Sequence, residues 1–276
     1  MKKSKRIEAA KETLQIFKQG FYCVEGRKID ISDIHKKSLE NSFVIKPEEA
    51  ESISEKYING NEKNKSIIKI VNESTVKAVL ELCDNKTKSI GVLNFASAKN
   101  PGGGFLNGAL AQEESIAVGT GLYPTQIKNE EYYVANRNFK SMMYTNYMIY
   151  SKDVVFIRDD KLNLLENPVT ASILTAPAVN YGQVLLKKED GVKAKKVMKN
   201  RMRMILSVFA YNKDKNLVLG AYGCGVFRND PKVIAEYWRS LLYDENYIGY
   251  FDNIIFAVLD NSKNRACIDA FEETFK

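Results

Sequence analysis

The sequence contains little of what several common catalytic and metal-binding sites require. His35 is its only histidine, so a Ser-His-Asp or Cys-His mechanism would have to take its base from that one residue. We expect His35 to be a polar surface residue. The cysteines contain no CxxC pair, which indicates neither a zinc site nor a disulfide framework, and we expect reduced thiols and no metal. The four cysteines are widely scattered: Cys23, Cys83, Cys224 and Cys267.

Signals for a membrane or for export are also lacking. No apolar run approaches the length of a membrane span. The basic start of the chain is followed by Glu8, Lys11 and Glu12, where a signal peptide would have its apolar region. We therefore expect a cytoplasmic protein with no membrane partner.

Two familiar nucleotide-binding loops are missing as well. The sequence contains no GxxxxGK[ST], the loop of nucleoside-triphosphate sites, and neither of its glycine clusters reads GxGxxG. The second absence weighs against a Rossmann dehydrogenase, and we expect no cofactor.

The composition is that of an ordinary globular protein. The 276 residues are 45% hydrophobic and 27% charged, and a chain of this length can bury a substantial core. The formal net charge of +7 suits a polyanionic partner, although a lysine-rich organism would give the same number.

A glycine-rich loop and a pair of carboxylates lie close together in the sequence. Three glycines at residues 102–104 are followed, after seven residues, by Gln-Glu-Glu at residues 112–114. Glycine has no Cβ, so this backbone can adopt positive φ and lie directly against a ligand. Residues 89–95 before the loop predict a buried strand, and residues 112–118 predict a helix whose N-terminus would favour an anion. This order is the one in which α/β proteins build binding sites.

The two carboxylates are adjacent on the predicted helix. Side chains at consecutive helical positions point about 100° apart, so Glu113 and Glu114 cannot both face one atom of a substrate. We expect the two residues to have different roles.

A second glycine loop occurs later in the chain. The predicted strand at residues 217–221 leads into Gly223, Cys224 and Gly225, and Asp230 and Pro231 are typical of the start of a helix. A glycine-spaced turn before a helix presents inward-pointing backbone N–H groups, which suit a diphosphate.

The remaining elements predict a mostly parallel or mixed sheet covered by helices. We expect residues 1–64 to form an accessory helical and loop extension on a main domain of residues 65–276. The tyrosines between residues 123 and 150 are expected to pack. The lysines and arginines of helix 192–209 are expected to form a solvated face, with contacts to the phosphates of a polymer as the alternative. Further predicted helices lie at 4–19, 75–82 and 263–275, and strands at 67–71, 90–94, 154–157, 171–175 and 253–259.

The joint pattern of three glycines, seven residues and Gln-Glu-Glu resembles the signature of the poly(ADP-ribose) glycohydrolases. Its setting, Leu-Asn-Phe-Ala-Ser-Ala-Lys-Asn-Pro at residues 93–101, is similar to the bacterial and fungal, microbial-type branch. The resemblance covers roughly residues 65–276. It implies a macrodomain-like α/β fold of three α/β/α layers with a mixed central sheet. It also implies a monomeric glycosidase that cleaves ribose–ribose bonds in poly(ADP-ribose), mainly from polymer ends, and releases ADP-ribose.

The resemblance also implies roles for particular residues. Glu114 would be the acid–base catalyst, and Glu113 and Asn100 would hold ribose hydroxyls. Phe227, which follows the second glycine loop, would lie near the ribose, although it could instead be a core residue under the loop. The expected catalytic residues are Glu114 and Glu113, and the expected substrate-binding residues are Asn100, Gly102, Gly103, Gly104, Gln112, Gly223, Cys224, Gly225, Val226 and Phe227.

Two other functions remain open. The chain could be a macrodomain reader that binds ADP-ribose without cleaving it, or a hydrolase for mono-ADP-ribose on a protein or nucleic acid. Readers can carry the phosphate loops but lack a carboxylate pair, so Glu113 and Glu114 favour an enzyme.

Overall fold

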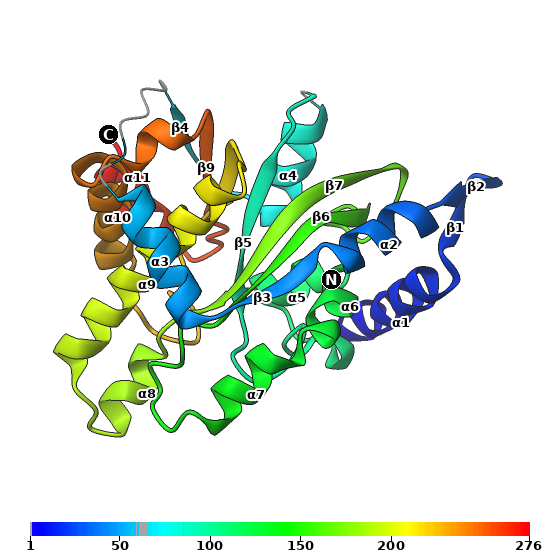
Figure 1. The fold of residues 1–276 in the computed structure, drawn as a ribbon. Coiled ribbons are helices and arrows are strands. Elements are labelled where there is room, and N and C mark those ends of the chain that lie inside the picture. Colours follow the sequence, from blue (N-terminus) through cyan, green and yellow to red (C-terminus); the bar gives the residue numbers. More distant parts are fainter. Residues whose placement is uncertain (1, 59, 61–65, 85) are drawn as a thin grey trace.

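A seven-stranded mixed sheet forms the centre of the protein in the computed structural model, which describes residues 2–58, 60, 66–84 and 86–276. Its strands are β3 (Ser42–Ile45), β4 (Ile67–Val71), β5 (Ile90–Ala96), β6 (Met148–Arg158), β7 (Leu164–Pro177), β8 (Asn216–Leu219) and β9 (Asn253–Ala257). They lie in the order β3-β6-β7-β5-β8-β9-β4 (Figure 1). The strands from β7 to β4 are parallel to their neighbours, whereas β6 is antiparallel to β7 and β3 to β6. The predicted mixed sheet is confirmed.

Helices cover both faces of this sheet (Figure 1). On one face lie α3 (Pro47–Tyr57), α9 (Gly191–Tyr211), α10 (Pro231–Arg239) and α11 (Ala266–Thr274). On the other lie α4 (Thr75–Asp84), α5 (Gln112–Ala117) and α6 (Leu122–Lys128). Consecutive strand residues such as Val92 and Leu93 pack into opposite clusters, so the strands are apolar on both faces. The three-layer α/β/α architecture is confirmed.

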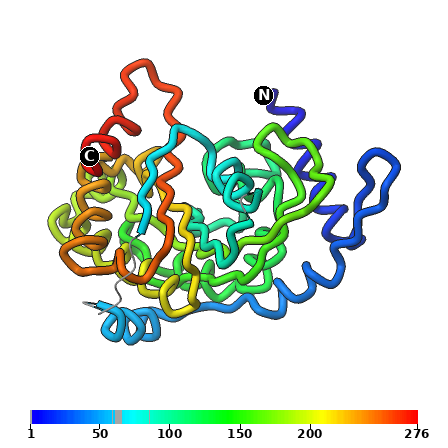
Figure 2. Tube along the Cα trace, turned by 90° about the horizontal axis from the view of Figure 1, so that it is seen from above, coloured from blue at the N-terminus to red at the C-terminus, as the bar shows by residue number. Residues whose placement is uncertain are grey.

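The N-terminal part packs beside the sheet. It consists of α1 (Lys3–Gln19), the hairpin of β1 (Phe21–Val24) and β2 (Arg27–Asp30), and α2 (Ser32–Glu40). Ile16 and Phe17 of α1 contact Val155 and Ile157 of β6. This hairpin and the C-terminal helix lie at opposite ends of the molecule (Figure 2). In the part of the chain that the structure describes, every helix is too short or too polar to cross a membrane.

The predicted N-terminal extension contributes to the main layers, which corrects our expectation. Ser42 to Ile45 form β3 and pair antiparallel with β6, and Ile53 of α3 packs into the same core cluster as α9. Residues 42–57 therefore belong to the sheet and its covering layer. The sequence did not predict this strand, because β3 has only four residues and the residues that flank it in the sequence are polar. The predicted boundary between residues 64 and 65 lies outside the described residues.

Two residues are buried where we expected solvent exposure. The ring centroid of His35 lies 4.6 Å from that of Phe17, and burial lowers the pKa of His35 to about 4. In α9, Lys193, Lys195 and Lys196 are exposed as predicted. Arg201 is fully buried, however, and donates hydrogen bonds to the side chain of Asn146 and to the carbonyls of Tyr144 and Pro177.

The packing role predicted for the tyrosines is supported. Tyr132, Tyr133 and Tyr150 are at most 1% exposed. Tyr132 and Tyr133 belong to α7 (Glu130–Asn138) and lie in one cluster with Ala96 at the end of β5.

A buried carboxyl just before the start of β8 makes the stability of the folded protein depend on pH. Asp214 is 3% exposed and accepts a 2.9 Å hydrogen bond from the hydroxyl of Tyr150. Burial raises its pKa from 3.8 to about 7. The folded state therefore holds this proton more tightly than the unfolded chain, and the associated stability is lost as pH rises from about 4 to about 7.

We expect Asp214→Asn to be more stabilising at pH 8 than at pH 5, by on the order of 2 kcal/mol, because an amide accepts the same hydrogen bond without ionising. Denaturant unfolding of both proteins at the two pH values measures this difference. An equal effect of the substitution at both pH values would contradict the assignment.

Candidate active site

The first glycine loop lies between the carboxyl end of β5 and the start of α5. Gly102 and Gly103 have φ of +64° and +58°, a conformation that glycine adopts without strain. The amide of Gly104 donates a 2.9 Å hydrogen bond to Oε1 of Glu114. A Cβ at Gly103 would lie 2.4 Å from the same oxygen and 3.1 Å from Oε2 of Glu113. Glycine at position 103 therefore lets the backbone approach both carboxylates.

Glu113 points into the protein. It is 3% exposed, and its carboxylate accepts hydrogen bonds from Asn94 Nδ2 (3.1 Å), Gln126 Nε2 (2.9 Å) and the amide of Ser97 (2.7 Å). Burial raises the pKa of Glu113 to about 7, against the opposing effect of these three donors. The bonds fix its position.

Glu114 points to a different environment, as expected from the helical geometry. It is half-buried and lines a cavity of about 490 Å³. The cavity wall also includes Arg6 of α1, Lys77 of α4 and Lys161 between β6 and β7. Of the two adjacent carboxylates, Glu114 is the one that lines this cavity.

Gln112 joins α5 to β5. Its Oε1 accepts a 2.8 Å bond from the amide of Phe95, and its Nε2 donates to the carbonyl of Leu93 at 2.8 Å and to Thr75 Oγ1 at 3.2 Å. We predicted that Gln112 binds substrate. In the structure, both the oxygen and the nitrogen of its side-chain amide form hydrogen bonds with protein atoms. The side chain therefore fixes the helix that carries the two carboxylates.

The second glycine loop follows β8, a parallel neighbour of β5, so both loops emerge at the same edge of the sheet. Gly223 has φ of +75°, and a Cβ there would lie 2.7 Å from Ala178 and from Asn229. Asn229 holds the loop by donating to the carbonyls of Gly223 and Val179. Asp230 caps α10 by accepting the amide of Lys232 at 2.9 Å, as predicted.

A second cavity, of about 470 Å³, lies between the start of α5 and the second glycine loop. Its wall contains Gln112 and Ser115 of α5, Cys224 and Gly225 of the second loop, and Cys267 of α11. The two cavities have wall residues in common and therefore adjoin, and we call them together the groove. Each has a volume in the range of ligand sites. The shared residues are Glu73, Ser74, Leu110, Ser115 and Leu259.

Three of the predicted substrate-binding residues lie outside the walls of the two cavities. Asn100 is exposed, and its carbonyl accepts the amide of Gly103 at 3.0 Å. Phe227 is half-buried, packs against the core cluster, and lies 6.1 Å from the ring centroid of Tyr144. Val226 is 85% exposed. Among the described residues that line the two cavities, these three do not occur, and neither do Glu113, Gly102, Gly103, Gly104 and Gly223.

The sequence alone did not reveal the residues that support Glu113. Gln126 is fully buried and links the carboxylate to the first glycine loop, because its Oε1 accepts the amide of Gly102 at 2.7 Å. Asn94 is also fully buried and bonds Thr175 Oγ1 at 3.2 Å. The one available signal was a polar Asn94 within an apolar strand. Nothing in the sequence around Gln126 marked it.

The chain matches the model of one protein family. A model of the microbial-type PARG catalytic domain matches residues 10–159, just over half of the chain. PARG denotes poly(ADP-ribose) glycohydrolase. The comparison with curated protein sequences gives no match.

Solved structures resemble the chain over nearly its whole length. The PARG of Thermomonospora curvata is 32% identical, covers 99% of this chain and 100% of its own, and superposes with a TM-score of 0.94. The same enzyme bound to the inhibitor ADP-HPD is 32% identical over 98% and 99%, with a TM-score of 0.91. The PARG of Deinococcus radiodurans in complex with ADP-ribose is 37% identical over 90% and 99%, with a TM-score of 0.84. The chain therefore belongs to the microbial-type poly(ADP-ribose) glycohydrolase family.

Proposed function

We propose that this chain hydrolyses the ribose–ribose bonds of poly(ADP-ribose) and releases ADP-ribose. The observation that carries the proposal is the position of Glu114, which lines the groove and accepts the amide of Gly104 from the first glycine loop, while its neighbour Glu113 is turned into the protein. The relatives that bind ADP-ribose and an ADP-containing inhibitor support the substrate class.

Glu114 would act as both acid and base. Most glycosidases hold two carboxylates on opposite sides of the scissile bond, and adjacent residues on one helix cannot do so. Glu114 would protonate the departing ribose oxygen and then take a proton from the attacking water. The diphosphate of the substrate, held by the amides of the second loop, would stabilise the positive charge that develops on the ribose.

The remaining site residues would position the substrate. Glu113, whose Oε2 already accepts the amide of Ser97, would hold a ribose hydroxyl together with Asn100. Phe227 would lie beside the ribose when the second loop closes on a ligand. A monomeric state and a cytoplasmic location stay predictions.

We expect cleavage to start from polymer ends. Arg6 Nε donates a 2.9 Å bond to the carbonyl of Gly108, which joins α1 to the first glycine loop. Arg6 and residues 160–162 wall the cavity beside Glu114, so a chain that continued past the bound ribose would meet protein. Chromatography of early products from long polymer should therefore show free ADP-ribose, with the final protein-linked unit removed poorly. Abundant oligomers at low conversion would mean that internal bonds are cut.

Metal chelators are expected to leave this activity unchanged. Within residues 2–58, 60, 66–84 and 86–276, no three His, Cys, Asp or Glu side chains are placed to hold an ion together. Turnover should be the same before and after treatment with a strong chelator. Loss of activity that a divalent ion restores would reveal a metal requirement.

Two other functions make different predictions. A reader would bind ADP-ribose without any turnover, and a mono-ADP-ribosyl hydrolase would release ADP-ribose from a singly modified protein or nucleic acid faster than from polymer. The carboxylate at the groove favours an enzyme over a reader, because a reader does not require an acid.

A further inference from the structure

Two cysteines far apart in the sequence meet at the wall of the second cavity. Cys224 belongs to the second glycine loop and Cys267 to the first turn of α11, and both line that cavity. Each thiol shifts the pKa of the other, so the two lie close enough to interact at this wall, while Cys224 Sγ also lies 3.9 Å from the carbonyl oxygen of Tyr222. The other cysteines lie elsewhere, Cys23 on the exposed β1 and Cys83 on α4.

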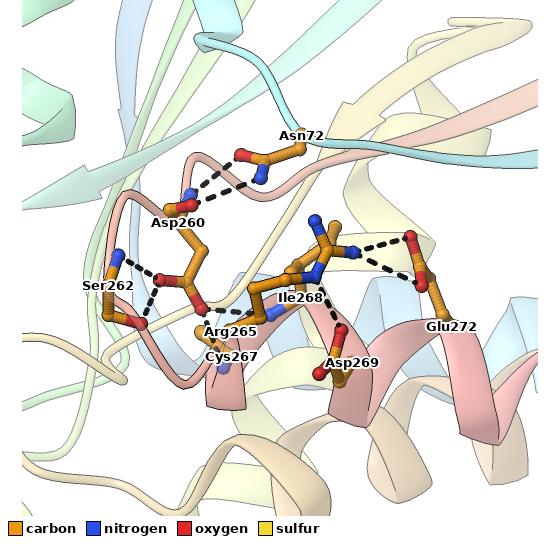
Figure 3. Close-up of polar contacts among 8 residues, drawn as sticks. All are labelled: Asn72, Asp260, Ser262, Arg265, Cys267, Ile268, Asp269 and Glu272. Carbon is orange, nitrogen blue, oxygen red and sulfur yellow. Dashed lines mark hydrogen bonds and ion pairs between the residues drawn. The ribbon is translucent and has the colours of Figure 1, made fainter.

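Cys267 is held in place by the segment before α11 (Figure 3). The carboxylate of Asp260 accepts the backbone amides of Cys267 (2.8 Å) and Ile268 (3.3 Å). The side chain of Asn72 bonds the backbone amide and carbonyl of Asp260 at 2.8 and 3.0 Å. These contacts anchor the start of α11 to the end of β4, so Cys267 is attached to the rigid part of the fold.

Cys224, in contrast, belongs to a loop that is exposed to solvent on one side. Its neighbour Gly225 is exposed, and a Cβ there would have no atom within 4 Å. A movement of Cys224 towards Cys267 would therefore be taken up by the second glycine loop.

The proximity makes the two thiols chemically different. Cys224 lowers the pKa of Cys267, whereas Cys267 and burial raise the pKa of Cys224. The thiol with the lower pKa has the larger thiolate fraction, so Cys267 would react first and Cys224 would resolve the product.

We propose that Cys224 and Cys267 form a reversible oxidation site, at which a hydroperoxide closes a disulfide across the wall of the ligand groove. The thiolate of Cys267 attacks a peroxide oxygen, so an S–O bond forms, the O–O bond breaks, and the alkoxide or hydroxide leaves with a proton. Cys224 then attacks the sulfenic sulfur, so the S–S bond forms and water leaves. Overall two thiols are oxidised and one peroxide bond is reduced, and a dithiol reverses the reaction.

The disulfide would change ligand binding, a consequence that rests on the proposed function. A disulfide holds its sulfur atoms about 2.05 Å apart, which is closer than any hydrogen-bonded contact of two thiols. The second loop must shift to reach that distance, and its amides are the groups that would hold the diphosphate. Oxidation should therefore weaken ADP-ribose binding, by about tenfold or more if the loss corresponds to one charge-assisted hydrogen bond.

The test treats the full chain with hydrogen peroxide, blocks the remaining thiols by alkylation, and maps the cysteines by peptide mass spectrometry. We expect one disulfide between Cys224 and Cys267, in the unaltered chain and in a Cys23→Ser/Cys83→Ser double variant. Calorimetric titration with ADP-ribose should show weaker binding after oxidation and recovery with dithiothreitol. Cys267→Ser, which cannot form the bond, should show no effect of peroxide on its own affinity.

The outcomes are separable. Overoxidised or unreacted cysteines without a Cys224–Cys267 bond would overturn the oxidation site. A disulfide that leaves ADP-ribose affinity unchanged would overturn its effect on binding. Failure of the reduced protein to bind ADP-ribose would contradict the proposed function, and the mass measurement would still decide whether the disulfide forms.

Discussion

Glu114→Gln is expected to lose polymer cleavage while it still binds ADP-ribose. The amide keeps the shape of the side chain, and its oxygen can still accept the bond from Gly104, but it can neither donate nor recover the catalytic proton. We expect kcat to fall by about 10³-fold and the Kd of ADP-ribose to stay within a few-fold of wild type. Turnover of defined polymer and calorimetric titration measure the two quantities.

The matched control is Glu236→Gln, which makes the same change on the exposed face of α10. This variant should cleave polymer like the unaltered protein. Near wild-type turnover in Glu114→Gln would contradict the assigned acid, and loss of binding together with turnover would indicate a structural role for Glu114.

Gly103→Ala is expected to cause the second large loss. Its added Cβ would lie 2.4 Å from Oε1 of Glu114 on a backbone with φ of +58°, so either the loop or the carboxylate must move. Misplacing a catalytic group by about 1 Å costs on the order of 10²-fold in rate, and we expect kcat/KM to fall by at least that factor.

Gly26→Ala is the control for backbone strain alone. Gly26 has φ of +78° in the hairpin between β1 and β2, and a Cβ there would have no atom within 4 Å. Both variants should unfold at similarly reduced denaturant concentrations, whereas only Gly103→Ala should lose activity. Equal activity in the two variants would mean that close approach of the loop to the carboxylates is unimportant.

The part of the site that is local in sequence could be predicted from the sequence. The strand, glycine loop and helix that carry Glu113 and Glu114 lie within about thirty residues, and each has its own signal in composition and periodicity. Helical geometry alone also indicated that the two carboxylates diverge. The second glycine loop was recognisable because Asp230 and Pro231 mark the start of the next helix.

The contacts that hold the site are long-range and left no local pattern. Gln126 reaches Glu113 and Gly102 only because α6 packs beside α5, and a glutamine in a short helix is ordinary for an exposed position. The pair Cys224 and Cys267 is similar, because the two cysteines have no motif spacing and come to one cavity wall only through the tertiary fold.

The errors in the fold have a related cause. β3 is too short and too polar at its flanks to predict a strand, and its pairing with β6 provides the hydrogen bonds that define it. His35 is buried by α1, an element that precedes it in the sequence, so its own neighbours gave no sign of burial. Tertiary packing decided both cases.

We expect Glu114 at the groove to hydrolyse poly(ADP-ribose). The most direct measurement compares ADP-ribose release from purified polymer and from a mono-ADP-ribosylated protein, with the wild-type chain and Glu114→Gln in parallel. We predict rapid release from polymer by the wild type alone and slow release from the singly modified protein. Binding of polymer without release by the wild type, or faster release from the mono-modified substrate, would contradict it.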